Sequence, residues 1–120
     1  MKKKIVYLSL LFSAVILFNV GCSSNTKSHV NPAQGAVAAS VTIQNFAFVP
    51  DTVHIKTGSA VEWTNKDTAP HTATSLATAF DSGSLSTDQK FSFTFNTPGT
   101  YSYHCLIHSM MKTAYVVVSN

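Results

Sequence analysis

Apolar and polar residues alternate along the chain from Val41 to its end, with a period of two. The clearest run has three phenylalanines separated by single polar residues. Such alternation is typical of strands with one buried and one exposed face. The alternating runs include residues 41–44, 53–56, 61–64 and 91–95. Turn-forming residues separate the runs, at 50–51, 57–58, 65–70, 81–83 and 98–99.

No stretch of this region combines helical spacing with helix caps, so the pattern favours an all-β fold. Many short strands divided by frequent turns are typical of two packed sheets. We therefore predict one domain over residues 41–120, a Greek-key β-sandwich of seven to eight strands.

The N-terminal part of the sequence has a different pattern. Three lysines at 2–4 precede an apolar run over 5–20, which is typical of a secretory signal peptide, predicted here as residues 1–21. Asn19-Val20-Gly21-Cys22 is similar to the bacterial lipobox, which predicts lipidation of Cys22 and membrane attachment through the lipid. The alternative is ordinary cleavage that leaves Cys22 as a free thiol. Small and polar residues predict that the segment 22–40 is a flexible linker, anchored by the lipid on Cys22.

The charge of the chain argues against nucleic-acid binding. The net charge of +3 comes from the N-terminal lysines, because the residues from Cys22 onward hold five lysines and five acids, and there is no arginine. Nucleic-acid binding needs basic residues clustered on one face. The charge therefore predicts no nucleic-acid partner. The signal peptide predicts a location outside the cytoplasm, in the periplasm or at the cell surface.

Cys105 is the only cysteine after Cys22, although proteins outside the cytoplasm usually pair their cysteines. A bound metal would occupy such a thiol, and the alternative is a small buried core residue. His108 and Met111 follow at steps of three residues. An extended step of three residues spans about 10 Å, whereas donors to one metal lie within about 4–5 Å, so this segment must curl into a loop.

His71 is the remaining candidate for a fourth donor. Strand parity places Cys105 on the core face and His104 on the outer face, and it exposes His54. Two imidazoles, a thiolate and a thioether suit copper better than structural zinc. Two histidines and one cysteine with a long axial methionine form a type 1 (blue) copper site, which holds one ion that cycles between Cu(I) and Cu(II).

With these residues the chain resembles the cupredoxins, in particular the amicyanin and plastocyanin-like members. The shared motifs are VEWTN at 61–65, PH at 70–71 and PGTYSYHCLIHSMM at 98–111. The resemblance implies that His71, Cys105 and His108 are equatorial ligands and that Met111 is axial, with Met110 as the alternative. It also implies that Asn65 ties the first ligand loop to the Cys105 loop.

The resemblance implies a one-electron carrier that docks transiently with redox proteins through an apolar patch around His108. The alternative is a copper-binding module for delivery, storage or sensing without a dedicated redox partner. The chain is not expected to be an enzyme, since the spare histidines at 29, 54 and 104 are not clustered in the sequence. We expect a monomer.

Overall fold

The computed structural model describes residues 35–120, which contain eight strands in two four-stranded sheets. The predicted signal peptide and Cys22 lie outside the described residues. Within residues 35–120 no helix is long and apolar enough to cross a bilayer. The strands are β1 (Val37–Gln44), β2 (Ala47–Val49), β3 (Thr52–Lys56), β4 (Ser59–Asn65), β5 (Thr74–Ser75), β6 (Lys90–Phe95), β7 (Gly99–His104) and β8 (Ala114–Ser119).

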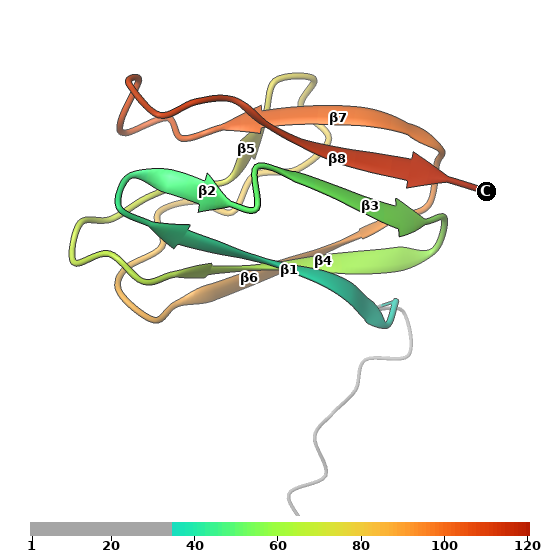
Figure 1. The fold of residues 1–120 in the computed structure, drawn as a ribbon, viewed down its shortest axis with the longest axis horizontal. Coiled ribbons are helices and arrows are strands. Elements are labelled where there is room, and N and C mark those ends of the chain that lie inside the picture. Colours follow the sequence, from blue (N-terminus) through green and yellow to red (C-terminus); the bar gives the residue numbers. More distant parts are fainter. Residues whose placement is uncertain (1–34) are drawn as a thin grey trace, which may run out of the picture.

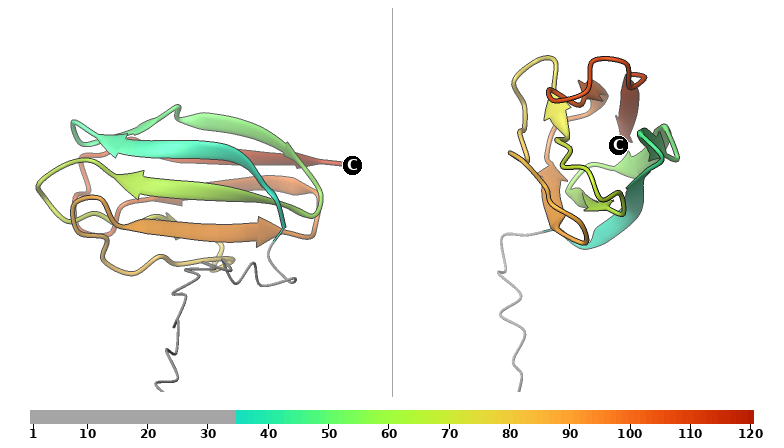
Figure 2. Two further views of the ribbon diagram at one scale, coloured as in Figure 1. Left: turned by 90° about the horizontal axis from the view of Figure 1, so that it is seen from below. Right: turned by 90° about the vertical axis from the view of Figure 1, so that its left-hand side faces the viewer.

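The two sheets face each other as a sandwich (Figure 1). One sheet has the order β2-β1-β4-β6 and the other has the order β3-β8-β7-β5. β1 runs parallel to β4 and β3 runs parallel to β8, so the chain crosses between the sheets as Greek-key connections require. Figure 2 shows β1, β4 and β6 side by side in one layer. The prediction of an all-β sandwich of seven to eight strands is confirmed.

The first strand begins earlier than the sequence pattern predicts. Residues 37–40, assigned to the linker from their composition, form the first half of β1 and pair with β4. The register shifts between Val37 and Ala39, so a bulge interrupts the period of two there. This bulge and the small residues around it, mostly alanine, leave no alternating pattern that would predict the strand, so the predicted linker boundary at residue 40 is wrong.

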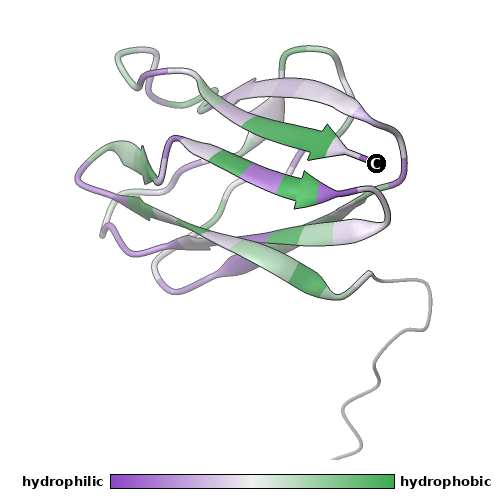
Figure 3. Ribbon diagram, turned by 45° about the vertical axis from the view of Figure 1, so that its right-hand side comes forward, coloured by the Kyte–Doolittle hydropathy of each residue, from purple (hydrophilic) through white to green (hydrophobic). Residues whose placement is uncertain are grey.

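The alternating residues meet between the sheets and form one core. The inward side chains of β3 and β8 are buried, and apolar and polar residues alternate along β3 (Figure 3). Trp63 on β4 is fully buried, and its ring packs against aromatic residues of both sheets. Its aromatic neighbours are Phe80, Phe91, Phe95 and Tyr103.

Three connections meet at one end of the sandwich, which the right-hand view of Figure 2 shows end-on. They are the turn between β1 and β2, the segment after β4 and the loop between β7 and β8. The strands fix the two ends of each connection, so side chains distant in the sequence are held at this pole. All four predicted metal ligands lie in the last two connections.

Candidate metal centre

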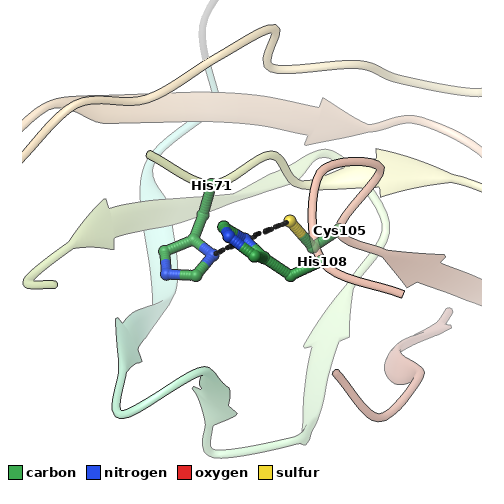
Figure 4. A group of neighbouring side chains, drawn as sticks. All are labelled: His71, Cys105 and His108. Carbon is green, nitrogen blue, oxygen red and sulfur yellow. Dashed lines mark hydrogen bonds between the residues drawn. The ribbon is translucent and has the colours of Figure 1, made fainter. Parts of the chain in front are cut away.

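Three predicted ligands converge at this pole. The Sγ atom of Cys105 lies 3.7 Å from Nδ1 of His71 and 3.9 Å from Nδ1 of His108. The two Nδ1 atoms are 3.2 Å apart. Figure 4 shows that the three side chains point toward one another. Among residues 35–120 this is the one group of at least three His, Cys, Asp or Glu side chains close enough to hold a metal ion.

A strand end, an isolated bridge and a loop bring the three donors to this point. Cys105 directly follows β7 and is buried on the same face as Tyr103, as strand parity predicts. His71 is held by two backbone hydrogen bonds with Leu85, and its side chain is fully buried. His108 lies in the loop after β7 and is half-buried. The site therefore combines two buried donors with one that reaches the surface.

The two neighbouring methionines have opposite environments. Met111 belongs to the buried core, and its amide donates a hydrogen bond to the carbonyl of His108, which closes the loop predicted from the spacing. Met110 is 74% exposed. His54 is exposed on β3, and His104 is half-buried opposite Thr74, so neither belongs to the cluster.

The spacing and chemistry of the donors fit a copper ion. Two donors bound to one ion at about 2.0–2.3 Å lie at most roughly 4.6 Å apart, and each of the three separations is shorter than this. Thiolate and imidazole ligands suit copper or zinc, and a thioether nearby favours copper. The residues present therefore fit a type 1 copper site.

A family model described as a cupredoxin-like domain matches residues 10–118. The chain belongs to the cupredoxin family. It is 33% identical to amicyanin-alpha of Methylorubrum extorquens over 116 residues, which cover 91% of this chain and 98% of that protein. It is 32% identical to amicyanin of Paracoccus denitrificans over 90 residues, which cover 71% of this chain and 67% of that protein.

Solved cupredoxin structures are similar over the folded part. The Cu(I) form of an amicyanin variant aligns with a TM-score of 0.63 at 33% identity, covering 72% of this chain and 85% of that one. A purple cupredoxin from Nitrosopumilus maritimus aligns with a TM-score of 0.62 at 29% identity, covering 68% of this chain and 99% of that one.

The resemblance implied that Asn65 ties the first ligand loop to the Cys105 loop, but in the structure Asn65 and Thr72 share this role. The Asn65 amide donates hydrogen bonds to the carbonyls of Ala69 and Leu85, at 2.9 and 2.8 Å, and so it shapes the segment that leads to His71. The tie to the Cys105 loop comes from Thr72 instead. Its hydroxyl accepts a hydrogen bond of 2.9 Å from the amide of Leu106, and its own amide lies 3.4 Å from Cys105 Sγ.

In this cupredoxin Asp67 is a further functional candidate, which the sequence did not predict. Its Oδ2 lies 2.9 Å from Nε2 of His71, on the side of the ring away from Cys105. A carboxylate in this position accepts a hydrogen bond from Nε2–H and so favours the tautomer whose Nδ1 lone pair is free for a metal. The only hint of this contact in the sequence is an acidic residue four positions before the ligand, and outside a helix that spacing does not bring two side chains together.

The pKa of Asp67 responds to several neighbours. Burial raises the pKa of this carboxyl, but hydrogen bonds from the amides of Phe46 and Asn45 and from His71 together outweigh burial. The pKa of Asp67 is therefore lowered, because these contacts favour the ionised form.

We expect this lowered pKa to make the metal-free protein sensitive to acid. A carboxyl whose pKa is lowered by folding stabilises the fold above the unfolded value of about 3.9, and this stabilisation is lost as the pH falls through the folded value. Asp67→Asn should therefore lose stability at neutral pH and flatten the dependence of unfolding free energy on pH below about 4. Urea titrations at a series of pH values measure this. Asp88→Asn, which removes an exposed carboxyl paired with Lys66, is the matched control.

Proposed function

We propose that this cupredoxin binds one copper ion through His71, Cys105 and His108, with Met111 as the axial ligand, and that it carries single electrons. The observation that carries the proposal is the triangle of two Nδ1 atoms and one Sγ at one end of the sandwich. The similarity to amicyanin, including a variant in its Cu(I) form, supports the choice of metal.

The protein's own residues would keep the donors nearly stationary. Bound copper would supply a centre that gains or loses one electron. The β7 strand and the Thr72 contacts hold Cys105, while Asp67 and Leu85 hold His71 on its other side. Donors held in this way need little rearrangement when the charge of the site changes. The scaffold therefore favours fast electron transfer, with the same side chains bound to copper in both oxidation states.

His108 is the proposed electron port. It is half-buried, and the apolar side chains around its loop are exposed, namely Leu106 at 60%, Ile107 at 46% and Met110 at 74%. A small apolar patch suits the brief docking of redox partners, whose interfaces often bury less than about 1,200 Å². We propose that partner redox proteins approach through this patch and that the protein works as a monomer.

The proposed location is outside the cytoplasm. The support comes from the sequence of residues 1–21, which has the features of a signal peptide, and from Cys22 in its lipobox-like setting. A lipid on Cys22 would tether the folded part to a membrane through the residues before β1. Mass spectrometry of the protein purified from membranes tests for the acyl chains.

Cyclic voltammetry of the copper-loaded protein tests the carrier role. A reversible one-electron couple is expected, together with slow loss of copper to a competing chelator. A protein that handles copper for delivery or storage would instead give up its copper readily. The absence of a reversible couple would remove the electron-carrier proposal while leaving copper binding intact.

The two methionines provide a matched pair of variants for the axial position. Met111→Leu is expected to change the reduction potential and the electron paramagnetic resonance spectrum, because the axial ligand tunes such sites. Met110→Leu should leave both unchanged, since its side chain is exposed. A spectrum that responds to Met110→Leu alone would transfer the axial role to Met110.

A further inference from the structure

The turn between β1 and β2 contains an unusual residue for its backbone. Gln44 pairs with Ala47, so Asn45 and Phe46 form a two-residue hairpin loop. Both have positive φ angles, 54° and 56°. Such loops favour Asn followed by Gly, because side chains with a Cβ are disfavoured in the left-handed region. Asn45 follows this preference and Phe46 does not.

A carboxylate from the metal centre holds this turn in place. Asp67 Oδ1 accepts a hydrogen bond of 2.7 Å from the amide of Asn45, and Oδ2 accepts one of 2.9 Å from the amide of Phe46. The same Oδ2 lies 2.9 Å from Nε2 of His71. One side chain thus links the strained turn directly to a metal-ligand candidate.

The ring of Phe46 lies against both histidines of the cluster. Its centroid is 5.1 Å from the ring of His71 and 4.9 Å from the ring of His108, with interplanar angles of 85° and 87°. Phe46 is 45% exposed and His71 is fully buried, so a ring that contacts both the solvent and the two imidazoles covers them on one side. A glycine here would suit the backbone and would lack this cover.

We propose that Phe46 is a cover for the metal centre that limits the access of water-borne ligands and chelators to His71 and His108. An apolar shell around a metal site controls solvent access. A phenylalanine at a position where the turn itself disfavours a side chain points to a role outside the turn. The metal-exchange part rests on the proposed function, whereas the covering of the imidazoles can be tested without metal.

The first test uses the metal-free protein and diethyl pyrocarbonate, which acylates accessible imidazoles. Phe46→Gly should be modified at His108 several-fold faster than the wild type, as measured by peptide mass spectrometry. His54, exposed on β3, serves as the internal reference and should not change. Phe46→Leu should remain near the wild-type rate, because it keeps an apolar side chain over the rings.

The stability of Phe46→Gly shows whether Phe46 covers the imidazoles or is needed to hold the fold together. Glycine relieves the left-handed backbone, so the thermal midpoint of the metal-free variant should equal or exceed that of the wild type. Should Phe46→Gly not fold, Phe46→Asn offers a second small residue that tolerates this conformation. An unchanged ratio of His108 to His54 modification in a folded variant would overturn the proposal.

The second test measures the transfer of copper from the loaded protein to a chromophoric chelator. Phe46→Gly should keep the visible thiolate-to-copper absorption and release its copper several-fold faster than the wild type and Phe46→Leu. Equal release rates would overturn the control of exchange by Phe46. A wild type that shows no copper absorption would refute the proposed function, and the modification experiment would still decide the role of the cover.

Discussion

Cys105→Ser is expected to abolish the intense visible absorption of the Cu(II)-loaded protein and to weaken copper binding strongly. Cys105 supplies the only thiolate in the cluster, and a visible band of this kind arises from electron transfer between a thiolate sulfur and copper. A serine hydroxyl has a similar size but is a harder ligand that does not ionise near neutral pH. The absorption spectrum after addition of Cu(II), with a competition titration for affinity, measures both effects.

Cys22→Ser is the matched control, since it removes the other cysteine of the chain. It should leave the spectrum unchanged. Far-UV circular dichroism should show that Cys105→Ser keeps its β-structure, because the substitution nearly preserves the volume of a buried residue. A full visible band in the folded Cys105→Ser protein would exclude Cys105 as the ligand and would refute the blue-copper proposal.

Trp63→Ala is expected to lower the free energy of unfolding by about 3–5 kcal/mol, the range for large aromatic truncations in a core. The Trp63 ring is fully buried and packs against Phe80 at 5.1 Å, Tyr103 at 5.4 Å and Phe91 at 5.7 Å between ring centroids. Small domains have only about 5–15 kcal/mol of stability in total, so this loss would leave the variant close to unfolding. Urea denaturation followed by circular dichroism measures the change.

Two controls test whether the stability loss of Trp63→Ala comes from the cavity that the missing ring would leave in the core. Trp63→Phe keeps an aromatic ring in the cluster and should be clearly less destabilising than Trp63→Ala. Tyr115→Ala removes an exposed ring from β8 and should change stability by only about 0.5 kcal/mol. Equal losses in Trp63→Ala and Tyr115→Ala would contradict the assignment of Trp63 to the centre of the core.

The strands were predictable because their signal is local. Alternation in 53–56 and 91–95 requires only that one face of a sheet be buried, and the structure has strands at both places. Parity along β7 likewise placed Cys105 inward and kept His104 out of the cluster. The first half of β1 escaped prediction, because its bulge breaks the period and its pairing partner lies more than twenty residues away.

The ligand loop was predictable for a similar reason. Cys105, His108 and Met111 are so close in sequence that chain length alone forces them into a loop if they share a metal. The role of Thr72 was not predictable in this way, because its contacts to Cys105 and Leu106 join residues 33 and 34 positions apart. Asn65 had been given that role by resemblance, and its hydrogen bonds go elsewhere.

The sequence by itself determined the fold class and the candidate ligands, since side-chain periodicity is local and the donor chemistry of a side chain is fixed by its residue type. Only the tertiary structure decided which groups surround those ligands. Asp67 accepts hydrogen bonds from the turn at 45–46, which lies more than twenty residues away in the sequence. Phe46 contacts both imidazoles from a backbone with positive φ angles. Such contacts depend on strand register and turn conformation together, and no local pattern of residues encodes both.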